Sequence, residues 1–158
     1  MTVIGLLSKA RAQGIRIATA ESCTGGMVAA ALTDIPGSSD VVECGFVTYS
    51  NNAKIDLLDI SPRTLEDHGA VSEEIAREMA DGALRHSYAQ LAVSVTGIAG
   101  PGGSEFKPEG RVCFGLAMQD QSTTTDTREF GALGRDQVRA MARDHAISLL
   151  DKALSQTA

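Results

Sequence analysis

The sequence has no tryptophan and few other aromatic residues, with two tyrosines and four phenylalanines among 158 residues. Because proteins that bind single-stranded nucleic acids stack the bases on aromatic rings, this scarcity argues against such a partner. The formal net charge is −6, from 14 lysines and arginines against 20 acidic residues. We therefore expect neither a nucleic-acid nor a membrane partner, and an anionic ligand would need a local cationic pocket.

The three cysteines, Cys23, Cys44 and Cys113, form an odd number and lack the paired spacing of a zinc site. Neither a disulfide framework nor a metal site is therefore predicted. No apolar run is long enough to cross a bilayer, and the first nine residues lack the pattern of a secretory signal. These absences lead us to expect a protein of the reducing cytoplasm.

Helix-like and strand-like segments alternate along the chain, without a repeat or a linker. This alternation predicts one domain over residues 1–158, of the α/β class, as a three-layer α/β/α sandwich with a mixed β-sheet. Helices are expected at residues 2–13, 24–33, 53–58, 61–68, from 72, and 135–155, and strands at 15–20, 41–50, 91–95, 111–118 and 125–131.

The most informative stretch is AESCTGG at residues 20–26, between a short apolar run and a helix-like segment. Two glycines let the backbone approach a ligand closely, and free N–H groups at a helix start favour negative charge. Ser22 at this turn is a candidate nucleophile beside an oxyanion site. A serine that only caps the following helix is the alternative, because serine is common at helix starts.

Cys23 competes with Ser22 for the role of nucleophile. A thiol at a helix start becomes more acidic, whereas free cysteines are commonly small buried apolar groups. Consecutive residues of a turn point in different directions, so only one of the two can face a cleft. The residues favour Ser22 without excluding Cys23.

Tyr49 and Lys54 lie just after a predicted strand, near the sheet edge where α/β proteins bind ligands. A lysine acts as a base only when it is neutral, so its pKa must be lowered by lost hydration or by a nearby positive field. An ordinary surface lysine on a helix is the alternative. The three histidines form neither a Ser-His-acid pattern nor a metal-binding pair.

Arg135, Arg139 and Arg143 recur every fourth residue and share one face of the last predicted helix. Arginines near a helix start oppose the helix dipole unless an anion neutralises them, which points to a phosphate or a carboxylate. Pairing with Asp136 and Asp144 is the alternative.

Five motifs in this order resemble the C-terminal domain of the CinA (competence/damage-inducible) proteins, which also occurs alone as nicotinamide-mononucleotide amidase. They are AESCTGG at 20–26, GFVTYSNNAK at 45–54, HGAVS at 68–72, VTGIAGP at 95–101 and RDQVR at 135–139. The resemblance covers about residues 3 to 155. It implies deamidation of nicotinamide mononucleotide to nicotinate mononucleotide and ammonia, in pyridine-nucleotide recycling.

The resemblance implies a Ser-Lys-Tyr mechanism through an acyl-enzyme, without metal or cofactor. Ser22 would be the nucleophile, Lys54 the base, and Tyr49 would relay the proton or orient Lys54. N–H groups near Thr24, Gly25 and Gly26 are expected at the oxyanion, and the ribose phosphate is expected between Gly97 and Gly100 and at Arg139. The full set of expected substrate-binding residues is Thr24, Gly25, Gly26, Asn51, Thr96, Gly97, Gly100 and Arg139.

Two alternatives stay open at this point. A regulatory module would bind a pyridine nucleotide without turning it over, with Lys54 charged and paired with phosphate. An amidase that uses Cys23 is the second alternative. Larger family members carry a preceding domain associated with pyrophosphatase activity, which has no counterpart here and is not transferred. The residues are compatible with a homo-oligomer and do not determine the number of subunits.

Overall fold

The computed structural model describes residues 2–104 and 106–156. Its strands form one sheet in the order β2-β1-β3-β4-β5, in which β1 runs parallel to β2 and β3 while β4 and β5 are antiparallel additions. The sheet is therefore mixed, as predicted. The strands are β1 (Ile17–Glu21), β2 (Val42–Val47), β3 (Leu91–Gly97), β4 (Arg111–Met118) and β5 (Thr124–Glu129).

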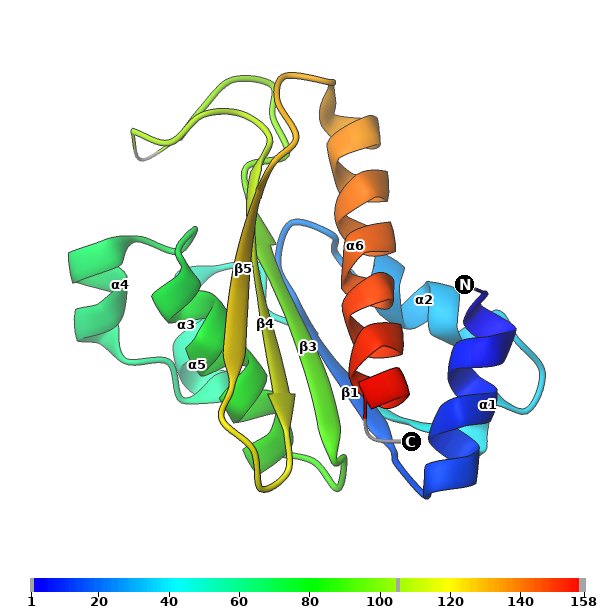
Figure 1. Cartoon of the computed structure of the whole chain (residues 1–158). Helices are drawn as coiled ribbons and strands as arrows, with labels where there is room; N and C mark the ends of the chain where they lie inside the picture. Colours follow the sequence, from blue (N-terminus) through cyan, green and yellow to red (C-terminus); the bar gives the residue numbers. More distant parts are fainter. Residues whose placement is uncertain (1, 105, 157–158) are drawn as a thin grey trace.

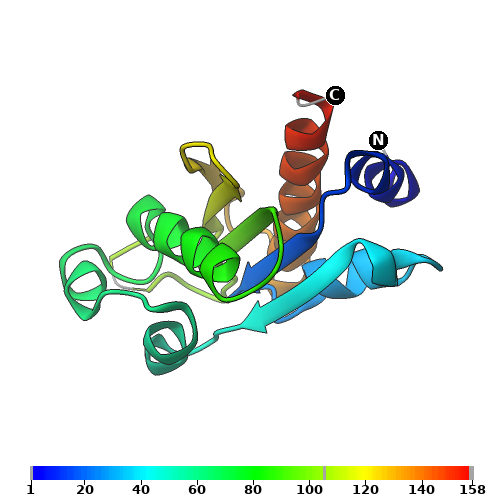
Figure 2. The ribbon, with the colours of Figure 1, turned by 90° about the horizontal axis from the view of Figure 1, so that it is seen from below.

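Helices cover both faces of the sheet, which confirms the predicted three layers (Figures 1 and 2). One face carries α3 (Asn51–Leu58), α4 (Pro62–His68) and α5 (Glu73–Arg85). The other carries α1 (Val3–Gln13), α2 (Met27–Thr33) and α6 (Arg135–Gln156). Apolar clusters on both faces are built from alternate residues of the strands, for instance Ile17 on one side and Ala18 on the other.

Side-chain caps explain where several helices begin. The hydroxyl groups of Thr2, Ser50, Ser61 and Ser72 each accept a backbone N–H of the first turn that follows. Gly14, with φ of 66°, closes α1 in the left-handed conformation that glycine adopts without strain.

Gly82 sets the position of α3, which carries Lys54. A Cβ atom at Gly82 would lie 2.2 Å from the carbonyl oxygen of Leu58, at the end of α3. Only glycine therefore lets α5 approach α3 this closely.

Some predicted boundaries were wrong. Helix α2 begins at Met27 rather than at residue 24, because residues 22–26 form a turn. Strand β2 ends at Val47, and Asn51 and Asn52 begin α3 instead of breaking a strand. Met141, an apolar residue of the last helix, lies outside the core and is 40% exposed.

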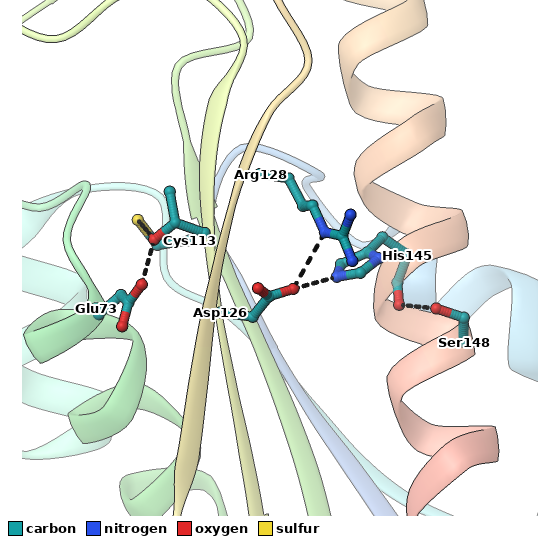
Figure 3. A network of polar contacts seen from close by, with 7 residues as sticks. Glu73, Cys113, Asp126, Arg128, His145 and Ser148 are labelled. Atoms are coloured by element: carbon teal, nitrogen blue, oxygen red, sulfur yellow. Dashed lines mark hydrogen bonds and ion pairs between the residues drawn. The ribbon is translucent and has the colours of Figure 1, made fainter.

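The edge strand β5 is linked to α6 by a polar network (Figure 3). Oδ2 of Asp126 lies 2.6 Å from Nε2 of His145 and accepts a hydrogen bond of 3.3 Å from Nε of Arg128. The His145 ring packs edge-on against Phe114, with 4.5 Å between the ring centroids. Partial burial raises the pKa of Asp126, but the hydrogen bonds from His145 and Arg128 outweigh it and leave this pKa below its usual value.

This network makes the first prediction. A carboxyl group whose pKa is lowered in the folded state stabilises the protein above its unfolded pKa, near pH 4, and this stability is lost as the pH falls through the folded pKa. Asp126→Asn should therefore lower the free energy of unfolding by roughly 0.2–1 kcal/mol at pH 7. Urea unfolding at several pH values measures the difference, which should shrink below about pH 4. Asp56→Asn, at an exposed position on α3, is the control, and an equal loss there would contradict this role of Asp126.

Candidate active site

Three of the predicted site segments follow the carboxyl ends of the parallel strands. Ser22 comes directly after β1, Tyr49 lies two residues beyond β2, and Gly97 ends β3. The backbone N–H of Ser22 donates to the carbonyl oxygen of Val95 at 2.9 Å, which ties the serine to β3. Ligands of α/β proteins bind at this edge of the sheet, so the topology brings these segments to one place.

A buried carboxylate shapes the turn that carries Ser22. Glu21 is 1% exposed, and its Oε1 accepts from Oγ1 of Thr24 at 2.7 Å and from the N–H of Val28 at 2.9 Å. Oε1 also accepts from the N–H of Gly26 at 3.3 Å, and Oε2 from that of Ala29 at 3.0 Å. The carboxylate thus accepts the N–H groups at the start of α2, where we had expected these groups to be free for an anionic ligand.

Two of the three amides expected to bind the oxyanion are already hydrogen-bonded within the turn. The amide of Gly26 binds Glu21, and the amide of Gly25 donates to the carbonyl oxygen of Ser22 at 3.0 Å. Within the described part of the chain, the amides of Cys23 and Thr24 donate no hydrogen bond to another residue. Of the expected Thr24, Gly25 and Gly26 amides, only that of Thr24 is thus available, together with the amide of Cys23.

Lys54 is not a surface residue, because it is 1% exposed. Its Nζ lies 3.0 Å from Oγ of Ser22, which is itself 9% exposed. The same Nζ donates to the carbonyl oxygens of Thr48, at 2.8 Å, and Tyr49, at 3.2 Å. The structure therefore brings together the serine and the lysine that lie 32 positions apart in the sequence.

Tyr49 meets Lys54 through its backbone, whereas its phenol group lies against Arg135. Nη2 of Arg135 donates to the phenol oxygen at 2.8 Å, and Nη1 donates to the carbonyl oxygen of Gly100 at 2.7 Å. Arg135 thus joins the segments that follow β2 and β3. The phenol oxygen accepts from Arg135, and the relay through this phenol stays a prediction.

Arg139 lies elsewhere than expected. Its guanidinium group donates to the carbonyl oxygen of Cys23 at 3.0 Å and to that of Thr24 at 3.4 Å. It therefore braces the turn of Ser22 and does not line the cavity. The geometry gives no support to Arg139 as the phosphate ligand.

The site opens into a cavity of about 190 Å³. Among the predicted residues, those that line it are Ser22, Asn51, Tyr49, Lys54, Thr96 and Gly97, whereas Thr24, Gly25, Gly26, Gly100 and Arg139 do not. The other lining residues are Cys23, Ala70, Val71, Ile98, Ala99, Ser104 and Arg135. Arg135 and the 70–71 segment were not selected as site residues, although the RDQVR and HGAVS motifs contain them.

The other candidate groups contribute little to this chemistry. Burial raises the pKa of the Cys23 thiol to about 12, and the charge of Glu21 acts in the same direction. None of the three histidines lines the cavity. Among residues 2–104 and 106–156, no group of three or more His, Cys, Asp or Glu could hold a metal ion, and no helix is long and apolar enough to cross a membrane.

Comparison with known proteins identifies relatives over nearly the whole chain. The family model described as the CinA C-terminal domain matches residues 4–154. A CinA-like protein from Chlorobium phaeobacteroides is 50% identical over 146 residues, which are 90% of this chain and 35% of that protein. The chain thus spans about a third of the length of the curated relatives it matches.

Solved structures with the same fold cover most of both chains. The competence/damage inducible protein CihA from Agrobacterium tumefaciens has a TM-score of 0.92 and 44% identity, over 97% of this chain and 93% of that one. A CinA superfamily protein from Escherichia coli has a TM-score of 0.89 and 36% identity, over 95% and 90%.

The raised pKa of Cys23 makes the second prediction. At pH 8, a thiol with a pKa of about 12 is ionised in only about one molecule in 10⁴, so the folded protein should resist alkylation at Cys23 by iodoacetamide. Cys44, half-buried on the edge strand β2, is the internal control and should be modified faster. Peptide mapping by mass spectrometry measures both, and faster modification of Cys23 would contradict the prediction.

Proposed function

Because this chain belongs to the CinA C-terminal domain family and places a buried lysine against a buried serine, we propose that it hydrolyses the carboxamide of nicotinamide mononucleotide. The products are nicotinate mononucleotide and ammonia. The separation of 3.0 Å between Nζ of Lys54 and Oγ of Ser22 carries the proposed chemistry. The resemblance of the motifs to nicotinamide-mononucleotide amidase supports the substrate.

The contacts of Lys54 match the valences of a neutral amine. The carbonyl oxygens of Thr48 and Tyr49 can only accept, so each takes one N–H of Lys54. A neutral amine has two N–H groups and one lone pair, and this lone pair can accept the hydroxyl proton of Ser22. Burial favours this neutral form, because an ammonium ion loses its hydration there.

The reaction then follows in two halves. Ser22 Oγ attacks the carboxamide carbon while Lys54 takes the hydroxyl proton, and the amides of Cys23 and Thr24 donate to the developing oxyanion. The C–N bond breaks as Lys54 returns the proton to the departing ammonia. Water then attacks the acyl-enzyme with Lys54 again as the base, which releases the carboxylate and restores the Ser22 hydroxyl.

Arg135 is the group we propose for the substrate phosphate. A guanidinium group has five N–H donors, and Arg135 uses two of them on Tyr49 and Gly100. It makes no ion pair with a carboxylate of the described residues, although it lines the cavity. Its remaining donors suit a phosphate, which arginine binds through two parallel hydrogen bonds.

A nucleotide-binding module without turnover is the second candidate, and the same lysine supports it. The three oxygen atoms around Nζ, from Ser22, Thr48 and Tyr49, also fit the three N–H donors of an ammonium ion. In that case Lys54 cannot accept a proton from Ser22, and the bound nucleotide would remain intact.

The protein that carries out this reaction would belong to the cytoplasm, where pyridine nucleotides are recycled. Its ligand would be a small molecule, with neither nucleic acid nor a membrane as a partner.

The third prediction separates the two candidates. Ser22→Ala should abolish ammonia release from nicotinamide mononucleotide, because the nucleophilic oxygen is lost, while calorimetry should still detect nucleotide binding. Cys23→Ala removes the thiol but keeps the backbone amide, and turnover should survive it. No ammonia release by the wild-type protein, with intact binding of the nucleotide, would establish the module instead of the amidase.

Lys54→Arg tests the base in the same assay. Arginine keeps a positive charge but supplies no neutral amine at any working pH. Its kcat should fall by about 10²-fold or more, and the limb of the pH–rate profile that reports the base should disappear. A near-normal kcat would end the Ser-Lys mechanism.

The fourth prediction concerns the phosphate. Arg135→Ala should raise KM for nicotinamide mononucleotide roughly ten- to a hundredfold, since a charge-assisted contact contributes about 1.5–3 kcal/mol. It should leave kcat/KM for the phosphate-free nicotinamide riboside little changed. Arg143→Ala is the matched control, because Arg143 lies on the same helix and pairs with Asp144. An equal loss on both substrates would exclude Arg135 as the phosphate ligand.

A further inference from the structure

We propose that Arg139 is a positioning residue that aims two backbone amides, those of Cys23 and Thr24, at the oxyanion of the reaction. This inference rests on the proposed amidase function and adds a role for a residue that contacts no substrate. It follows from the orientation of two successive peptide groups in the turn after β1.

The first peptide group joins Ser22 to Cys23. Its carbonyl oxygen, on Ser22, accepts the N–H of Gly25 at 3.0 Å. In a trans peptide the N–H points opposite to the C=O, so the N–H of Cys23 is directed away from Gly25. Apart from the thiol group of Cys23 itself, that N–H has no acceptor among the described residues.

The second peptide group joins Cys23 to Thr24, and Arg139 holds it. Nε of Arg139 donates to the carbonyl oxygen of Cys23 at 3.0 Å, so the N–H of Thr24 points away from Arg139. Nη2 of the same guanidinium group reaches the next carbonyl oxygen, on Thr24, at 3.4 Å. One planar fork thus spans two consecutive carbonyl groups, which a lysine ammonium group cannot match.

The residues of this turn differ in their access to the cavity. Ser22 and Cys23 line the cavity whereas Arg139 does not, so the turn separates the guanidinium group from the substrate space. The positive charge on the carbonyl side also polarises the peptide group and strengthens its N–H as a donor. Buried, preorganised donors of this kind stabilise a developing negative charge without reorganisation during the reaction.

The surrounding residues fix Arg139 and its approach to the turn. Its neighbour Val138 is fully buried on α6, so the helix is anchored in the core at this point. A Cβ atom at Gly25 would lie 3.3 Å from Nη2 of Arg139, and Gly25 has a φ of 58°. Glycine at this position therefore serves both the left-handed backbone and the close approach of the guanidinium group. Figure 1 shows that α6 begins at the end of the sheet where the β3–β4 loop lies.

The experiment compares Arg139→Leu and Arg139→Lys with the wild-type protein. Losing an oxyanion donor lowers kcat by about 10²–10³-fold in other hydrolases, so Arg139→Leu should lower kcat by about 10²-fold, with little change in KM. The loss should be equal for nicotinamide mononucleotide and nicotinamide riboside. Arg139→Lys should recover part of kcat, because it restores one charged donor. Arg143→Leu, one helical turn further along α6, should have little effect.

A thioamide substrate gives a measurement that would stay unchanged if Arg139 had only a structural role. Sulfur accepts hydrogen bonds poorly, so an oxyanion site discriminates against thionicotinamide mononucleotide in favour of the oxygen amide. The ratio of kcat/KM for the two substrates should fall toward one in Arg139→Leu. An unchanged ratio, an unchanged kcat, or a rise in KM confined to the phosphate-bearing substrate would each overturn the proposal.

Backbone NMR distinguishes failure of this inference from failure of the amidase proposal. If the wild-type protein releases no ammonia, the amidase function is wrong. The positioning role of Arg139 is then tested by the rigidity of the Cys23 and Thr24 amides alone. Order parameters of the Cys23 and Thr24 amides should fall from about 0.85 in the wild-type protein toward 0.6 in Arg139→Leu, with the remaining backbone unchanged. Amides that stay rigid in this variant would show that Arg139 does not position them.

Discussion

The rest of the site depends on the buried carboxylate of Glu21. A buried charge is costly unless hydrogen bonds replace its hydration, and four donors, from Thr24, Gly26, Val28 and Ala29, surround this one. These contacts join the end of β1 to the start of α2, so they hold the intervening turn at both ends. Ser22 is the first residue of that turn, and its position follows from the anchoring of the carboxylate.

The position of Lys54 depends on packing from the opposite face of the sheet. Helix α3 lies against α5 because Gly82 offers no Cβ to the carbonyl oxygen of Leu58. Lys54 then projects toward the carboxyl ends of the parallel strands, where it meets Ser22 and two carbonyl oxygens. A buried lysine loses its hydration, which makes its charged form costly, and such a group typically marks a functional site.

Much of the fold could be predicted because its signals are local. Apolar periodicity and short polar caps located most helices, and β-rich runs located the strands of the mixed sheet. The motifs also pointed to Ser22, Tyr49 and Lys54, whose shared cavity the structure describes. Prediction was weaker where a residue has two plausible partners. Arg139 was expected to hold a phosphate, and it holds the carbonyl groups of Cys23 and Thr24 instead.

The sequence by itself determined the α/β class, the order of the elements and the turn chemistry around Ser22, since these depend on neighbours within a few residues. Only the tertiary structure decided which N–H groups stay free, which arginine faces the cavity, and that the Cys23 thiol is buried and weakly acidic. The facing of the arginines and the burial of the thiol depend on elements far away in the sequence, whereas the amides of Gly25 and Gly26 are occupied by Ser22 and Glu21 of the same turn. A helix periodicity places Arg135 and Arg139 on one face, but it does not specify what lies opposite that face.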